Sequence, residues 1–193
     1  MADEEKDVVH NVDLTNDTYT VKQSLVRNKY SVYGPGGELV LKGKQKLFKM
    51  KEDFSLYNSE GDPVFRVKAD SIMDIAGDYT LTDEATGEPI AVLEKNFTVF
   101  KHSWRIKDPD SRDMVARIES RSTIIDALRV FSDLVSLLPH KYSIETPEGE
   151  KIGDIKGSFS LRDRYEVHIE DSRGIPKEAL VAATLTVDAL EGN

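Results

Sequence analysis

The chain has 193 residues, of which 39% are hydrophobic and 32% charged, so it is long enough for one domain with a full core and is not composed like a disordered protein. It contains no cysteine, which excludes a disulfide framework, a thiolate nucleophile and a cysteine-based metal site. The formal net charge of −9 disfavours non-specific binding to nucleic acid or anionic lipid, because both attract surplus Lys and Arg.

The N-terminal segment, residues 1–16, is acidic and polar, has no sustained periodicity and contains no apolar stretch like that of a signal peptide. We expect a flexible acidic tail here, a single domain over residues 17–193 and, by default, a cytoplasmic location. Residues 18–26 then carry Tyr19, Val21 and Leu25 at alternating positions, which predicts a strand.

Repeated hairpins are the main pattern of the chain. Six aromatic residues are each followed two positions later by an aliphatic one, with aromatic spacings of 24, 25, 25, 38 and 23. The pairs are Tyr30/Val32, Phe54/Leu56, Tyr79/Leu81, Trp104/Ile106, Tyr142/Ile144 and Tyr165/Val167. After each of the first five, a turn containing Gly, Pro, Asn or Asp leads to a second alternating run. The pattern predicts hairpins over residues 29–42, 54–68, 79–93, 104–118 and 142–155.

The sixth aromatic strand, residues 164–169, has no partner after it along the chain. Pairing it with residues 18–26 would close the sheet on itself and remove exposed edges. This gives about twelve strands, although residues 45–50, 71–75 and 97–100 could also pair.

The residue pattern predicts helices in two segments. Residues 122–138 carry Ile124, Leu128, Phe131 and Val135 at helical spacing, so they predict an amphipathic helix that covers the sheet or faces a partner or a membrane surface. Residues 179–187 are uncharged, and a helix without a polar side must be surrounded. At 1.5 Å per residue this run spans about 14 Å, against roughly 30 Å of hydrocarbon, so it is too short to cross a membrane. A closed barrel would enclose it, although its Val and Thr residues also permit a buried strand.

The order of three features carries a family resemblance: residues 29–42 with the turn Gly34-Pro35-Gly36-Gly37, residues 54–61, and residues 175–188. The chain resembles the LURP-one-related and phospholipid-scramblase-like group, which has the tubby C-terminal-like fold, over residues 19–190. This resemblance implies a mainly β, closed antiparallel barrel of about twelve strands around a buried C-terminal hydrophobic α-helix. We expect that fold here, with one amphipathic helix inserted near residues 122–138.

The resemblance implies little chemistry. Members of the group are variously linked to phosphoinositide binding, lipid scrambling, transcription and plant defence. Scrambling is disfavoured here because the chain lacks the Cys-rich palmitoylation segment and the longer apolar tail of scramblases.

Basic residues are the candidate ligand-binding site. The densest cluster is Lys42, Lys44, Lys46, Lys49 and Lys51. On an extended strand, Lys42, Lys44 and Lys46 share one side and could hold an anionic head group, at about 1 kcal/mol per lysine near a charged membrane. The alternative is a solvated strand face that discourages edge pairing. A second set could add to a phosphate-binding face if its members converge: Lys107, Arg117, Arg121, Arg162 and Arg164.

Catalytic and metal motifs are missing from the sequence. Asp108, Asp110 and Glu119 match positions 1, 3 and 12 of a calcium-binding loop. However, Arg112 stands at position 5, and Asp113 replaces the glycine that position 6 requires. The segment therefore predicts a hairpin turn instead. The four histidines fit no zinc spacing, and no serine-nucleophile or phosphate-loop glycine motif is present. We therefore expect no enzyme, no cofactor and no metal site.

The function we expect is a non-enzymatic cytoplasmic binding or regulatory module, peripheral at the inner membrane surface if its partner is an anionic phospholipid. Its ligand would be an anionic lipid head group or another phosphate-bearing molecule. The alternative is a structural or protein-interaction module that uses the apolar face of residues 122–138.

Overall fold

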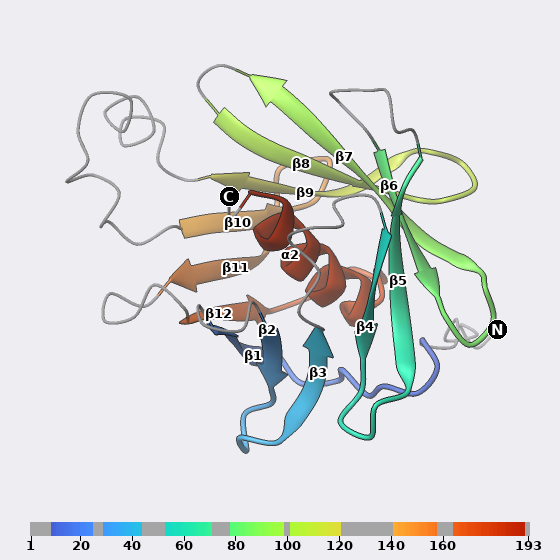
Figure 1. The fold of residues 1–193 in the computed structure, drawn as a ribbon. Coiled ribbons are helices and arrows are strands. Elements are labelled where there is room, and N and C mark those ends of the chain that lie inside the picture. The colour runs from blue at the N-terminus through green and yellow to red at the C-terminus, as the bar shows by residue number, and fades with distance from the viewer. Residues whose placement is uncertain are drawn as a thin grey trace, which may run out of the picture.

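The structure is a computed structural model that describes residues 9–24, 29–43, 53–70, 78–98, 101–120, 141–157 and 164–191. Within these residues, twelve antiparallel strands form a closed barrel around a C-terminal helix (Figure 1). The elements are β1 (Thr18–Ser24), β2 (Lys29–Tyr33), β3 (Leu39–Gly43), β4 (Asp53–Tyr57), β5 (Pro63–Ala69), β6 (Asp78–Asp83), β7 (Pro89–Thr98), β8 (Lys101–Lys107), β9 (Met114–Ser120), β10 (Lys141–Glu145), β11 (Lys151–Gly157), β12 (Arg164–Ile169) and α2 (Lys177–Glu191). The predicted fold class is confirmed.

Strand order follows chain order, and the barrel closes where β1 pairs with β12. At this seam Tyr19 is opposite Val167, and Val21 is opposite Tyr165. The five predicted hairpins and the predicted closing pair are all present. Residues 97 and 98 extend β7, whereas residues 45–50 and 71–75, which could also have paired, lie outside the described part of the chain.

The alternation of side chains explains the repeated aromatic and aliphatic pairs. Residues two apart on a strand point to the same side of the sheet, so both members of a pair such as Trp104 and Ile106 face inward. Cross-strand register then joins Trp104, Ile118 and Ile144 into one buried row. The pattern that predicts hairpins is therefore also the pattern that fills the core.

Helix α2 occupies the middle of the barrel (Figure 1). Every residue from Ala179 to Val187 is between 0 and 4% exposed. Its two buried threonines satisfy their hydroxyls within the helix: Thr184 donates to the Leu180 carbonyl at 2.9 Å and Thr186 to the Ala182 carbonyl at 2.8 Å. The run from Ala179 to Val187 consequently needs no polar partner from the sheet and can be surrounded by apolar side chains.

Gly153 on β11 allows two backbones to approach closely beside the seam. It is opposite Ile169 of β12, and a Cβ added to it would lie 2.4 Å from the carbonyl oxygen of His168. That separation is shorter than any ordinary contact, so a side chain at this position would force β11 and β12 apart.

The N-terminal segment differs from the expectation. Val9 is 6% exposed and Leu14 is fully buried, and both belong to the core. The His10 amide and Nδ1 lie 3.2 and 2.9 Å from Asp83 Oδ2. The expected tail is therefore wrong for residues 9–16, because two isolated apolar side chains anchor this segment without producing a periodic pattern; residues 1–8 lie outside the described part.

The amphipathic helix predicted over residues 122–138 also lies outside the described residues. Among the helical residues that the structure describes, no segment has the length and apolar character needed to span a membrane.

Truncation of a central side chain tests the packing of α2. We expect Leu180→Ala to lower the free energy of unfolding by about 2–5 kcal/mol, because it leaves a cavity in a site with no access to water. Urea unfolding followed by circular dichroism measures this loss. Val115→Ala, at a partly buried position, is the control and should cost less. Equal, small losses for the two variants would contradict a fully packed helix.

Candidate functional site

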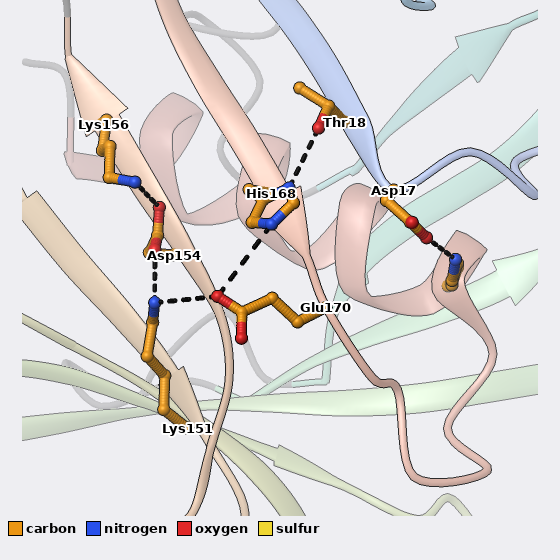
Figure 2. A network of polar contacts seen from close by, with 8 residues as sticks. Asp17, Thr18, Lys151, Asp154, Lys156, His168 and Glu170 are labelled. Atoms are coloured by element: carbon orange, nitrogen blue, oxygen red, sulfur yellow. Dashed lines mark hydrogen bonds and ion pairs between the residues drawn. The ribbon is translucent and has the colours of Figure 1, made fainter.

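Polar residues line the outward faces of β10, β11, β12 and β1. Cross-strand register places Ser143, Asp154, His168 and Thr18 in one row that crosses the seam. Figure 2 shows the contacts around this row. We call these residues, with Lys151, Lys156 and Glu170, the seam network.

Asp154 is the centre of the seam network, and its side chain is only 5% exposed. Lys151 donates to one carboxylate oxygen, and the Lys156 ammonium lies 2.8 Å from the other (Figure 2). Burial by itself would raise the pKa of Asp154, but the two ammonium groups outweigh it and hold this pKa below its usual value. The hydrogen bond to Asp154 in turn raises the pKa of Lys151.

The network continues across the seam. Lys151 Nζ lies 3.2 Å from Glu170 Oε1, which is 3.9 Å from His168 Nε2. The Nδ1 atom of His168 lies 2.9 Å from Thr18 Oγ1 on β1. These contacts tie β11, β12 and β1 together on the outside of the barrel, so their first role is to stabilise its closure.

A separate pair fastens the start of α2 to the same region. Lys177 donates to Asp17 (Figure 2). It also donates to the Thr15 carbonyl at 3.2 Å. The hydrogen bond from Lys177 is the main reason that the pKa of Asp17 is lowered. The start of α2 is thus joined to the residues that directly precede β1.

A basic hollow lies between the end of β11 and the start of β12. Its volume is about 270 Å³ and its lining comprises Lys156, Gly157, Arg164, Tyr165 and Glu166. The Lys156 and Arg164 side chains are 58% and 46% exposed. We use the term basic hollow for this lining together with Lys22, which lies directly opposite Arg164 on β1.

Positive charge in the basic hollow is only partly compensated. Like charges directly opposite each other on a sheet repel, as Lys22 and Arg164 do. The carboxylate of Glu166 is 3.9 Å from Arg164 Nη2, at the outer limit of an ion pair. Lys22 instead places its ammonium 4.5 Å from the ring centre of Tyr33. An anion bound between these cations would relieve their repulsion.

Of the predicted lysine cluster, only Lys42 belongs to the described residues. It lies on β3 and donates to the Ser59 carbonyl at 2.9 Å, so its ammonium reaches toward the turn after β4. Lys44, Lys46, Lys49 and Lys51 lie outside the described part. The structure therefore does not test the cluster as a site.

The second basic set is divided in the structure. Lys107 lies 2.6 Å from Glu94, and Arg117 lies 2.9 Å from Glu145, so each is held by a carboxylate on a neighbouring strand. Arg164 is three strands farther around the barrel from Arg117, in the basic hollow. Arg121 and Arg162 lie outside the described residues.

Sequence reasoning missed Lys22 and Lys156. Each is an ordinary outward-facing lysine of an alternating strand, and only the pairing of β1 with β12 and of β12 with β11 brings them beside Arg164. No local signal could have identified them.

Within the part of the chain that the structure describes, no group of three or more His, Asp or Glu side chains could hold a metal ion. Asp108 accepts hydrogen bonds from the Asp110 and Ser111 amides at 3.0 and 2.9 Å, which confirms its place in the predicted hairpin turn.

Comparison with protein families matches residues 39–188 to the LURP-one-related family. Among solved structures, the X-ray structure of a protein from Arabidopsis thaliana is similar at 10% sequence identity, covers 91% of this chain and 90% of that chain, and has a TM-score of 0.39. No curated protein matches the chain.

Removal of one charge tests the seam network. We expect Asp154→Asn to destabilise the protein by about 1–3 kcal/mol at neutral pH, because two ammonium groups lose their shared partner. Because the pKa of Asp154 is lowered in the fold, this stability is present above the unfolded value near pH 4 and is lost as the pH falls through the folded value. Urea unfolding at neutral pH and at successively lower pH measures the difference from wild type.

The matched control is Asp110→Asn, at an exposed turn position. A difference between Asp154→Asn and wild type that persists unchanged in acid would contradict the assignment.

Proposed function

The chain belongs to the LURP-one-related family, and from this premise we propose that it is a binding module that recognises a phosphate-bearing or other anionic group at the basic hollow. Membership of this family favours a binding or regulatory role over catalysis. The observation that carries the proposal is the placement of Arg164 directly opposite Lys22, beside a hollow that Lys156 also lines.

The three cations suit an anionic group in different ways. The planar guanidinium of Arg164 can donate two parallel hydrogen bonds to a phosphate, whereas lysines act as flexible point charges. Lys156 can turn toward a ligand without leaving Asp154 unpaired, because Lys151 remains on the same carboxylate. The seam network therefore holds Lys156 beside the hollow, with Lys151 on the other oxygen of Asp154.

The predicted lysine cluster extends this proposal. Lys42 is in register with Ser31, Ser31 with Lys22, and Lys22 with Arg164, so one outward row runs across β3, β2, β1 and β12. The other lysines of the predicted cluster, Lys44, Lys46, Lys49 and Lys51, follow Lys42 in the sequence, and we propose that they contribute to the same anion site. A cytoplasmic location, peripheral at the inner membrane surface, follows if the anion belongs to a phospholipid.

The alternative, a protein-interaction module using the apolar face of residues 122–138, stays a prediction. That segment lies outside the described residues, and no described contact favours it.

Charge removal tests the proposed function. The variant Lys22→Gln/Lys156→Gln/Arg164→Gln should bind anionic ligands about a hundredfold more weakly, since each cation near an anionic surface contributes about 1 kcal/mol. The probes are inositol hexakisphosphate, measured by calorimetry, and vesicles of phosphatidylcholine and phosphatidylserine, measured by flotation. We expect wild type to bind at least one of them.

The control variant is Lys68→Gln/Arg112→Gln/Arg173→Gln, which removes three exposed cations elsewhere on the barrel and so has the same net charge. It should bind like wild type, and both variants should melt as cooperatively as wild type. Equal binding by the two triple variants, or no binding of either probe by wild type, would remove the proposal.

A further inference from the structure

A second hollow lies beside the start of β3, where the chain turns from β4 into β5. Its volume is about 530 Å³, and its lining comes from three segments: residues within 11–16 before β1, residues 38–40 at the start of β3, and residues within 58–62 in the turn after β4. None of them belongs to the basic hollow. We call this site the acidic hollow.

One edge of β3 is open along the acidic hollow. Within the described residues, β4 pairs only with the last two residues of β3. After Tyr57 the chain leaves the sheet, because the Asn58 amide donates to the Asp62 carbonyl at 2.9 Å inside the turn and not to β3. The start of β3 therefore has β2 on one edge and the hollow on the other. An open strand edge is a template for pairing with another chain.

Negative charge surrounds the acidic hollow. The described residues that line it include no Lys, Arg or His but four carboxylates, those of Asp13, Glu38, Glu60 and Asp62. None of the four forms an ion pair with a described cation, and Lys42, which reaches the rim, donates to a backbone carbonyl there. Because these like charges repel one another, a positively charged occupant is attracted to the hollow.

The features of the acidic hollow suit an extended chain better than a single ion. No group of three or more acidic side chains in the described part is placed to hold a metal ion, so the carboxylates are spread around the hollow. Val12 and Val40 are partly buried against the core and also line the hollow. An extended peptide can pair its backbone with an open strand edge while its alternating side chains reach two kinds of surface.

Described contacts join the walls of the acidic hollow. The Asn58 side chain donates to the Asn11 carbonyl at 3.3 Å and links the turn to the segment before β1. Lys42 donates to the Ser59 carbonyl at 2.9 Å and links the same turn to β3. The buried side chain of Leu14 anchors the segment before β1 in the core. The hollow is therefore formed before a ligand binds, which reduces the cost of ordering it on binding.

We propose that the acidic hollow binds an extended basic segment of a partner protein, which adds a strand to the open edge of β3. Lys and Arg side chains of that segment meet the four carboxylates, and the apolar side chains between them meet Val12 and Val40. This interaction goes beyond anion binding at the basic hollow and does not depend on it.

The probe that tests this proposal is a fluorescein-labelled peptide of sequence Lys-Val-Arg-Val-Lys-Val, and fluorescence anisotropy measures its binding to the full chain. One control peptide has Glu in place of each cation. The other is methylated on every backbone nitrogen, so it keeps the side chains but cannot donate to a strand. We expect salt-sensitive binding of the probe, no binding of the Glu peptide, and about tenfold weaker binding of the methylated peptide.

The protein variant Glu38→Gln/Glu60→Gln removes two carboxylates of the acidic hollow. Both side chains are exposed, whereas the other two carboxylates also take part in local turn contacts. Affinity for the probe should fall about tenfold, because two exposed ion pairs are lost. The matched control, Glu88→Gln/Asp110→Asn, makes the same change in net charge at two other exposed turns and should bind like wild type. Unchanged thermal melting of both variants establishes that they are folded.

Hydrogen exchange locates the bound peptide. A saturating amount of the probe should slow exchange within residues 38–41 and leave exchange within residues 84–88 unchanged. No binding of the probe by wild type, or equal affinities of the two double variants, would overturn the proposal. Slowed exchange elsewhere but not at β3, or equal affinity for the methylated peptide, would overturn it as well, because both results exclude strand addition.

Discussion

The uncharged run Ala179–Val187 of α2 is the constraint on which the rest of the structure depends. A helix with no polar side is stable in water only if apolar groups surround it, and the residues from Ala179 to Val187 are at most 4% exposed. A sheet can surround a helix only by closing, so the pairing of β1 with β12 is as necessary to the fold as the helix itself. Gly153 allows β11 and β12 to approach closely beside that pairing, and the seam network adds polar contacts on the outside of the wall.

Closure also creates the candidate site. Lys22 and Arg164 are far apart in the sequence, and they become direct neighbours only because the first and last strands pair. Lys156 joins them through the next strand pair, where Asp154 and Lys151 hold the surrounding wall. The interaction that completes the core thus also determines where positive charge collects on the surface, which links the stability of the barrel to its proposed binding role.

Much of the fold could be predicted because its signals are local. The Gly34-Pro35-Gly36-Gly37 turn and the Trp104/Ile106 pair follow from backbone preferences and two-residue periodicity, and the apolar run before Asp188 predicts an enclosed helix. The site could not be predicted, because strand register decides which outward lysines meet, and register depends on the whole closed sheet. The burial of Val9 and Leu14 could not be predicted for the same reason, because it depends on distant strands and not on their neighbours in the sequence.

Hydrogen exchange of the α2 backbone amides tests the central claim most directly. If the helix is enclosed by the barrel, the amides of residues 182–187 can exchange only when the barrel opens, so their protection should equal the free energy of global unfolding measured by urea. When the stability of the protein is changed by urea, the exchange rates of these amides should change in parallel with those of inward-facing strand residues such as Ile118 and Ile144. Rapid exchange of the helix amides while the strands remain protected would contradict the account.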